Sequence, residues 1–336
     1  MGQTRHTLLI YGATGYTGRL ACEQAQKVGL DFTVAGRTAY GLEKLAKELQ
    51  VPYHAFEVND AITTMHELPT CHTLLNCAGP FSRTAKPLMT ACIRHHINYL
   101  DIAAELDSYE LAETLDLDAR QAGVMLLPGC GGSVAMLGCL ARRTMEIAAS
   151  PVQRLNIALH VAGAMSRGSV ASAMGGMTNA PLERRMGELT AIEDIVPMEF
   201  DFLDGRGRVS CAPMTLPDLI TASKVTGIEN IRTFVNVSAV ALPAEGPEGI
   251  SDGPSERDRD LNPYHAAAVM ESTDGSVAMK VLHTVNGYTF TVKASIEAAH
   301  RVLEGTSQPG FQTPAGIFGT GFVESIANSK FIDIVQ

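Results

Sequence analysis

The most constraining feature of the chain lies near its start, where an apolar run leads directly into a glycine-rich turn. Residues 7–11 predict a buried strand, and helix-forming residues follow the turn. A G-x-x-G-x-x-G turn between a strand and a helix presents backbone N–H groups and a helix N-terminus to a pyrophosphate. The turn therefore predicts a dinucleotide-binding site at Gly12, Thr14, Gly15, Tyr16, Thr17 and Gly18.

Apolar runs and helix-compatible stretches alternate over the first 130 residues. Strands are expected at 7–11, 32–35, 51–56, 73–76, 99–102 and 124–127, and helices at 19–27, 41–49 and 85–95. Strands separated by helices of this length form right-handed βαβ units and a parallel sheet. Six such strands predict an α/β, doubly wound Rossmann domain over residues 1–129.

The pattern changes after residue 130. Strands are expected at 154–161 and 231–241 with a hairpin around Asp274-Gly275, a helical stretch at 169–188 and a mobile loop at 243–263. They predict a second α+β domain over residues 130–289, built on a mixed or antiparallel sheet, which binds substrate and forms a homodimer. The segment 290–336, with a helix at 290–303 and a tail, is expected to return to the Rossmann domain.

The end of the second predicted strand indicates which dinucleotide binds. An NAD site places Asp or Glu there, roughly 20 residues after the glycines, on the ribose 2′-OH. This chain has Arg37 instead, and Asp31 lies at the wrong end of the strand. Arg37 can form a forked contact with a 2′-phosphate, which predicts NADP; the alternative is a solvated surface arginine.

The turn after the fourth predicted strand contains small residues that let the backbone pass close to the second ribose. We expect cofactor contacts there from Cys77, Ala78, Gly79, Pro80 and Phe81, with Phe81 beside the nicotinamide. The alternative is a tight turn with one core aromatic. Asp101, at the end of the next strand, is predicted either to contact the cofactor or to cap the following helix.

Composition excludes several partners. The net charge of −10 repels phosphate backbones and anionic lipid, so we expect neither a nucleic-acid nor a membrane partner. The seven cysteines form no C-x-x-C pair, and no His, Asp or Glu spacing suggests a metal site. Reduced thiols and the lack of a signal-peptide pattern predict a cytoplasmic protein. Residues 124–141 are uncharged, but Pro128 and nearby glycines favour strand, turn and helix over a membrane span.

Several motifs together resemble those of the saccharopine dehydrogenase-like oxidoreductases. They are GATGYTG, AGR, NCAGPF and YLDIAAE in the first half, and GAMSRG, TGIENI and PGFQTPA in the second. The second set is similar to the short members, which include trans-acting enoyl reductases working beside polyketide synthases. The resemblance implies NADP as the cofactor, a reductase activity and a biosynthetic synthase as a partner.

One segment departs from the family pattern. Relatives resemble G-F-D-x-x-P after the sixth strand, whereas this chain has Gly129-Cys130-Gly131-Gly132-Ser133-Val134-Ala135. The acid and the proline are both missing, so substrate and reaction type do not transfer. Cys130 is a candidate nucleophile, although a buried structural thiol is the stronger interpretation because no base is placed to activate it.

Catalytic candidates come from both halves of the chain. Tyr99 and Glu105 flank the end of the fifth predicted strand, near the expected nicotinamide. Ser166 and Arg167 begin a helix that would suit a substrate oxygen, although an ordinary N-cap and a surface arginine explain them equally well. His265 is a further candidate proton donor.

Two classes of function follow. The first is an NADPH-dependent reductase of an activated C=C bond, enoyl or enone, in a small-molecule or polyketide-type intermediate, with C=N reduction of the saccharopine dehydrogenase type as the alternative. The second is a non-redox protein that keeps the fold, such as a nucleotide sensor, an isomerase or a cyclase. The missing acid in the 129–135 turn keeps the second class open.

Overall fold

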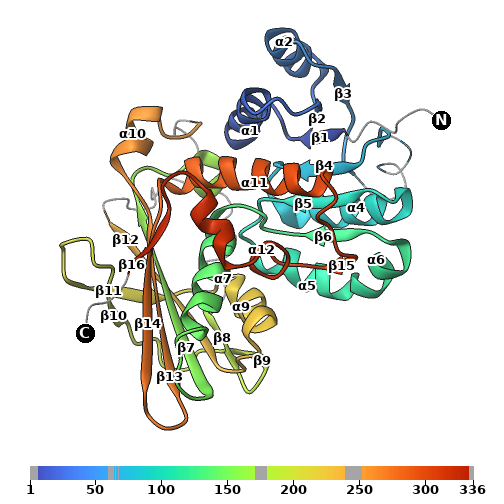
Figure 1. The fold of residues 1–336 in the computed structure, drawn as a ribbon. Coiled ribbons are helices and arrows are strands. Elements are labelled where there is room, and N and C mark those ends of the chain that lie inside the picture. Colours follow the sequence, from blue (N-terminus) through green and yellow to red (C-terminus); the bar gives the residue numbers. More distant parts are fainter. Residues whose placement is uncertain are drawn as a thin grey trace. The chain divides into compact units, whose positions relative to one another are not determined.

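The computed structural model describes residues 7–59, 64, 66, 68–170, 180–238 and 252–332 (Figure 1). The chain divides into two compact units. Unit 1 contains the described residues up to Gly131 together with Thr291–Gln312. Unit 2 contains Gly132–Phe290 and the described residues from Thr313 onward. Each unit is described by itself.

Unit 1 is built on a seven-stranded sheet in the order β15-β6-β5-β4-β1-β2-β3, and every neighbouring pair is parallel. Its strands are β1 (Leu8–Tyr11), β2 (Phe32–Gly36), β3 (Tyr53–Ala55), β4 (Thr73–Asn76), β5 (Asn98–Asp101), β6 (Met125–Leu127) and β15 (Gly310–Phe311). The predicted Rossmann sheet is confirmed, because the six expected strands occur at the expected places. The strands β1, β4 and β5 are buried along their whole length, as is usual for a parallel sheet.

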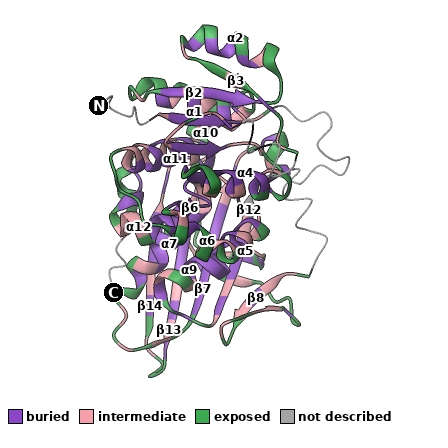
Figure 2. Ribbon diagram, turned by 90° about the vertical axis from the view of Figure 1, so that its right-hand side faces the viewer, coloured by how far each residue is buried: buried purple, intermediate pink, exposed green. Residues whose placement is uncertain are grey.

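Amphipathic helices connect these strands. They are α1 (Tyr16–Lys27), α2 (Ala39–Leu49), α4 (Phe81–His95), α5 (Leu106–Thr114) and α6 (Asp116–Ala122), and α11 (Gly287–Leu303) enters unit 1 at Thr291. In α2 the buried residues recur at helical spacing, and Figure 2 shows its buried and exposed faces. The sequence predicted α1, α2 and α4 but not α5 or α6, which are short and rich in acidic residues.

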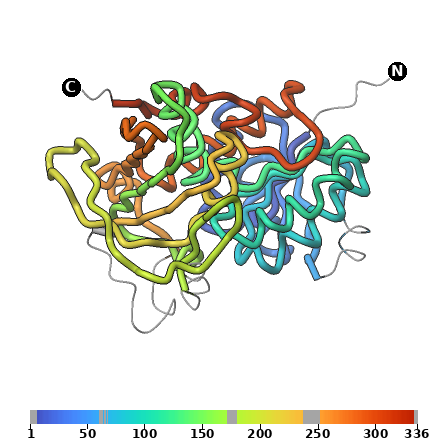
Figure 3. The backbone as a smooth tube through the Cα atoms, turned by 90° about the horizontal axis from the view of Figure 1, so that it is seen from below, coloured from blue at the N-terminus to red at the C-terminus, as the bar shows by residue number. Residues whose placement is uncertain are grey.

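The C-terminal segment differs from the expected return of residues 290–336 to the Rossmann domain. Of this segment, Thr291–Gln312 lies in unit 1: it contains α11 without its first four residues, and β15, which pairs with β6. Figure 3 shows this red chain beside the blue-green chain of the sheet. Residues from Thr313 belong to unit 2, in which β16 (Lys330–Ile332) pairs with β14 (Val277–His283). The tail thereby covers an edge strand that would otherwise leave its backbone groups unpaired.

Unit 2 contains a nine-stranded mixed sheet in the order β10-β11-β12-β7-β13-β14-β16, with β8 and β9 attached beside β12. The other strands are β7 (Val152–Ala162), β8 (Leu182–Arg185), β9 (Glu188–Ala191), β10 (Met198–Asp201), β11 (Arg208–Pro213), β12 (Ile231–Ser238) and β13 (His265–Ser272). The helices are α7 (Gly132–Met145), α9 (Asp218–Thr226), α10 (Glu256–Leu261) and α12 (Pro314–Phe318). The pair β7 and β12 is parallel, and the remaining pairs are antiparallel.

Two predictions for unit 2 are corrected by the structure. The end of the expected helical stretch 169–188 is the strand β8, whereas residues 171–179 lie outside the described residues. Part of the expected loop 243–263 is the helix α10, started by a capping box in which Ser255 and Asp258 bind each other's backbone; residues 243–251 lie outside the description. The strands expected at 154–161 and 231–241 occur as β7 and β12, although residues 239–241 lie outside the described residues, and the hairpin at Asp274-Gly275 occurs as expected.

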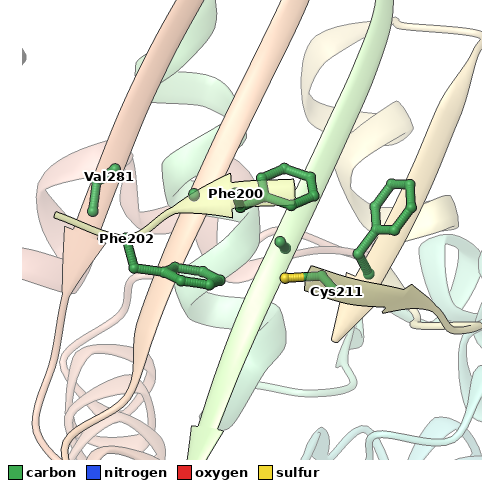
Figure 4. Close-up of a cluster of buried hydrophobic side chains, with 7 residues drawn as sticks. Phe200, Phe202, Cys211 and Val281 are labelled. Atoms are coloured by element: carbon green, nitrogen blue, oxygen red, sulfur yellow. The ribbon is translucent and has the colours of Figure 1, made fainter. Parts of the chain in front are cut away.

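Aromatic side chains pack on this sheet. Phe200 and Phe202 form a buried cluster with Cys211, Phe234 and Val281, and Figure 4 shows the labelled members. Residues 125–145 form β6, a turn and α7, as the interrupted apolar run predicted. Within the described part of the chain, no helix is long and apolar enough to cross a membrane.

We expect the stability of the protein to depend on a buried acid, Asp218, which begins α9. Its Oδ1 accepts a hydrogen bond from the Thr221 hydroxyl at 3.3 Å, and its Oδ2 has no partner among the described residues. Burial raises the pKa of Asp218 from 3.8 to about 7. Between these values the unfolded chain releases a proton that the folded protein retains, so stability falls as pH rises, by up to about 4 kcal/mol.

Urea unfolding of wild type and Asp218→Asn between pH 4 and pH 8 measures this effect. The variant should lose stability less steeply with rising pH than the wild type, because its amide does not titrate. Asp260→Asn, at an exposed position in the same unit, is the matched control and should keep the wild-type slope. Equal slopes in Asp218→Asn and wild type would contradict the assignment.

Candidate cofactor site

The glycine-rich turn brings three chain segments into contact at the carboxyl end of β1. Gly12 adopts a φ of +81°, and its N–H donates to the Ala35 carbonyl at the end of β2 at 2.9 Å. A Cβ atom at Gly12 would lie 2.7 Å from the Ala78 nitrogen, and one at Gly18 would lie 2.2 Å from the Gly12 oxygen. A side chain at either position would overlap the neighbouring backbone, so both residues must be glycine.

The N-terminus of α1 is open to an anion. The helix starts at Tyr16 after the N-cap Gly15, which carries no side-chain acceptor, and no acidic residue lies in its first turn. Thr14 and Gly15 are exposed, whereas Tyr16 and Thr17 are partly buried and Gly18 is buried beneath them. The backbone N–H groups of this helix N-terminus and the helix dipole suit a pyrophosphate, which is the site that the sequence predicted.

We expect Gly12→Ala to abolish dinucleotide binding and to destabilise the protein by about 3 kcal/mol, from the left-handed backbone and the contact with Ala78. Gly29→Ala is the matched control. Gly29 also has a positive φ, of 75°, but no atom lies within 4 Å of the position that an alanine Cβ would take there. This substitution should cost only about 1 kcal/mol and leave binding intact. Thermal unfolding and cofactor titration measure both effects; similar losses in the two variants would contradict the close approach.

The end of β2 leaves a second anion site open. Arg37 is exposed and forms no ion pair with any described residue. Thr38 is the N-cap of α2, yet its hydroxyl makes no capping hydrogen bond. A guanidinium, a free hydroxyl and a helix N-terminus together match a 2′-phosphate, and no carboxylate follows β2 to bind a ribose 2′-OH.

Cofactor choice can be tested at this position. Arg37→Asp should weaken NADPH binding by about 1–3 kcal/mol, because a charge-assisted hydrogen bond is replaced by repulsion. NADH binding should change little or improve. Lys44→Asp, the same charge change at an exposed position within α2, should leave the preference for NADPH in place. Equal affinities of the wild type for NADPH and NADH would remove the basis for this role of Arg37.

The turn after β4 has the tight geometry that was expected as the alternative to cofactor contact. The Gly79–Pro80 peptide bond is cis, and both residues are exposed. The Ala78 N–H donates to Asn76 Oδ1 at 2.9 Å, and the Cys77 N–H donates to the Tyr11 carbonyl at 2.8 Å. Burial raises the pKa of the Cys77 thiol well above its usual value. The turn thus presents Gly79 and Pro80 at the carboxyl edge of the sheet.

Phe81 and Glu105 lie at the expected strand ends but have internal partners. Phe81 is the first residue of α4 and only 7% exposed, so it packs in the core instead of lying open beside a nicotinamide. The Glu105 carboxylate accepts from the N–H groups of Phe81 and Ser82, at 3.2 and 2.9 Å. Since the N-cap Pro80 has no acceptor side chain, Glu105 caps α4 from the turn after β5.

Tyr99 and Asp101 are fully buried at the end of β5. The Tyr99 hydroxyl donates to Asp101 Oδ2 at 2.8 Å, and the N–H groups of Ala103 and Gly129 donate to Oδ1 at 2.9 and 2.8 Å. Burial raises the pKa of Tyr99 well above its usual value and that of Asp101 to about 6. Both residues are therefore closed off from solvent, so neither the proton-donor role of Tyr99 nor the cofactor contact of Asp101 has support in this structure. Asp101 also does not cap the following helix, because the N-cap of α5 is Glu105.

The turn after β6 contains the segment in which this chain departs from the family pattern. The Cys130 N–H donates to the Asp101 carbonyl at 2.8 Å, and burial raises the pKa of its thiol well above the usual value. Cys130 is therefore the buried, protonated thiol that the sequence favoured. A Cβ at Gly131 would lie 2.6 Å from the Thr291 oxygen, so this glycine allows α11 to approach.

The candidates in unit 2 have structural partners. Ser166 Oγ accepts from the Ser169 N–H at 3.2 Å, which is an N-cap contact, and the Ser166 N–H donates to the Tyr288 hydroxyl at 2.6 Å. Arg167 is exposed and forms an ion pair with the exposed Asp252. These are the N-cap and surface-arginine interpretations that the sequence had left open, and an exposed pair of this kind contributes little energy.

His265 lies in a row of imidazoles across β7, β13 and β14. It is paired in register with His160 and with His283, and its ring centroid is 4.2 Å from that of His283. Burial lowers the pKa of His265 to about 4, so it is neutral near pH 7 and a weak proton donor. Among the described residues, no three His, Cys, Asp or Glu side chains are arranged to hold a metal ion.

Sequence reasoning recognised the motif Pro309–Ala315 but not its structural role. The Phe311 N–H donates to Asp116 Oδ1 at 2.7 Å, and a Cβ at Gly310 would meet the same atom at 2.5 Å. Thr313 then caps α12 by accepting from the Gly316 N–H. The positive φ of 92° at Gly310 lets the chain join β6 at this point, although a two-residue strand leaves almost no periodic signal.

The parallel sheet, its glycine turn and the open site at Arg37 define a dinucleotide-binding domain. Residues 8–127 match the saccharopine dehydrogenase NADP binding domain. The human saccharopine dehydrogenase-like oxidoreductase is 30% identical over 125 residues, which are 32% of this chain and 29% of that protein. A trans-acting enoyl reductase of Mycobacterium tuberculosis (strain H37Rv) is 26% identical over 134 residues, which are 37% of this chain and 32% of the relative.

These curated relatives are matched over about a third of their length. Over nearly the whole chain, saccharopine dehydrogenase (L-Glu forming) from Saccharomyces cerevisiae shares the fold, with a TM-score of 0.66 at 12% identity, covering 98% of this chain and 100% of the other. The resemblance found in the sequence is thus confirmed. Over residues 8–127, unit 1 is similar to the saccharopine dehydrogenase NADP-binding domains, and this match indicates NADP(H) as its cofactor.

Proposed function

We propose that the protein is an NADPH-dependent reductase that transfers hydride to an activated C=C bond of an enoyl or enone substrate. The observation that carries the proposal is the NADP-binding domain, with its open anion sites at α1 and Arg37. Bound there, the nicotinamide supplies the hydride. The similarity of this domain to a protein named a trans-acting enoyl reductase supports the choice of acceptor.

The residues of unit 1 bind and orient the cofactor but offer little acid–base chemistry. Tyr99 and Asp101 are buried, and Glu105 is occupied by the N-terminus of α4. For polarising the acceptor and stabilising the enolate, Ser166 and Arg167 stay predictions from the sequence, with water as a source of the proton.

Two other reactions serve as alternatives. Reduction of a C=N bond is favoured by the similarity to a protein named saccharopine dehydrogenase-like oxidoreductase. A non-redox role as a nucleotide sensor, isomerase or cyclase is favoured by the turn at Gly129–Ala135, which carries no acid.

Deuterium transfer from C4-deuterated NADPH distinguishes these reactions. The purified protein is incubated with a panel of enones, enoyl thioesters and imines, and the products are examined by mass spectrometry and NMR. Deuterium at the β-carbon of a saturated product supports the proposal. Label on a carbon bonded to nitrogen identifies an imine reductase. Tight NADPH binding without oxidation by any acceptor favours a non-redox role and contradicts the proposal.

The partners and location stay predictions. We propose a small-molecule or polyketide-type substrate presented by a biosynthetic synthase, and a cytoplasmic homodimer. Sedimentation velocity tests the dimer, and a single species at the mass of one chain, 35.8 kDa, would exclude it.

A further inference from the structure

The carboxyl edge of the parallel sheet contains one buried polar network that the proposed chemistry does not use. A doubly wound sheet binds the two nucleotides of its cofactor on its two halves, so β4, β5 and β6 serve the nicotinamide half. β5 lies between β4 and β6 in the sheet order. Asp101, the last residue of β5, is therefore at the centre of this half.

The Asp101 carboxylate connects the turns that follow all three strands. Gly129 reaches it from the turn after β6, and Ala103 from the turn after β5, each through its backbone N–H. Tyr99 carries the connection to the third turn: its hydroxyl donates to Asp101 and accepts from Asn76 Nδ2 at 3.1 Å. Asn76 in turn accepts from the Ala78 N–H, inside the turn that exposes Gly79 and Pro80.

The direction of these hydrogen bonds is fixed from end to end. A carboxylate only accepts, so the Tyr99 proton points at Asp101 and its oxygen is left to accept from Asn76. The Asn76 amide then presents its oxygen to Ala78 and its second N–H to the Thr84 hydroxyl at 3.1 Å. If the group at position 101 became a donor instead of an acceptor, each hydrogen bond between it and Ala78 would be disturbed, because every bond in this chain depends on the direction of the one before it.

We propose that Asp101 is a positioning residue: its carboxylate, through Tyr99 and Asn76, sets the three turns that receive the nicotinamide half of the cofactor. It acts without touching the cofactor, because it is fully buried. The proposal rests on NADP(H) binding and not on which bond the enzyme reduces. Asp101, acting through Tyr99 and Asn76, is thus the residue that holds the 76–81 turn in place.

Asp101→Asn tests the proposal, because it keeps the shape but introduces a donor. The Tyr99 oxygen then faces N–H groups from both Asn76 and the new amide, and its own proton loses its acceptor. We expect NADPH to bind about 10-fold or more weakly. Adenosine 2′,5′-bisphosphate, which reaches only the Arg37 half, should bind within about twofold of wild type. Asp118→Asn, at an exposed position on α6, is the matched control.

A second substitution provides a rescue. Tyr99→Phe in the Asp101→Asn background removes the hydroxyl that faces two donors, so the double variant should recover part of the NADPH affinity that the single variant loses. A purely structural role gives another result: both ligands weaken together, and the double variant is worse than either single variant. Unchanged NADPH binding in Asp101→Asn, or the absence of any recovery, would likewise overturn the proposal.

The wild-type protein supplies a test that needs no variant to fold. Burial raises the pKa of Asp101 to about 6, and a protonated carboxyl is a donor like the amide. The ratio of the NADPH dissociation constant to that of adenosine 2′-monophosphate should therefore rise as pH falls through about 6. The 2′-phosphate is the only phosphate monoester in either ligand, so its own titration near pH 6 cancels in the ratio.

The other titratable groups around Asp101 are few. Tyr99, Cys77 and Cys130 face it from the three strand ends, and burial keeps the pKa of each well above its usual value. Glu105 faces it from the turn after β5. The pH dependence should persist in Glu105→Gln and vanish in Asp101→Asn. A ratio that does not change with pH in wild type would contradict the proposal, whereas a wild type that binds neither ligand would instead refute cofactor binding.

Discussion

The nicotinamide half of the cofactor site depends on the burial of one charge. A carboxylate taken out of water is costly unless every strong donor it needs is supplied by the protein, and Asp101 receives three such donors. Because the donors belong to different segments, their geometry is shared, and no turn can shift without leaving a buried polar group unpaired. The carboxyl edge of the sheet is therefore rigid, because its turns must all keep their hydrogen bonds to Asp101.

The adenosine half is organised in the opposite way, by the absence of side chains. Gly12 and Gly18 let backbone atoms approach to distances that any Cβ would prevent. Arg37 and Thr38 then stand exposed at the end of β2. One half of the site is thus fixed by a fully bonded polar interior, and the other by close backbone packing with its ligand-binding groups left open.

The parts of the site that the sequence predicts are the local ones. The glycine turn and Arg37 were recognisable because strand, turn and helix follow one another within the motif. The sequence placed Tyr99, Asp101 and Glu105 at the correct sheet edge but not in their roles, since their partners Asn76, Gly129 and Phe81 lie more than 20 residues away. The strand β15 and the tail pairing of β16 were missed for the same reason: two or three residues carry no periodic signal, and only tertiary pairing defines them.

The late strand β15 has a consequence for how the chain is made. The sheet of unit 1 is completed by residues 310–311, which leave the ribosome only after the strands β7 to β14 of unit 2 have been synthesised. Until then β6 is an unpaired edge on a growing chain, which is a condition that favours misassociation. Unit 2 likewise waits for β16 to cover β14. The two sheets are therefore completed nearly together, by strands that lie within about 20 residues of each other, and cutting the chain before β15 would leave neither sheet whole.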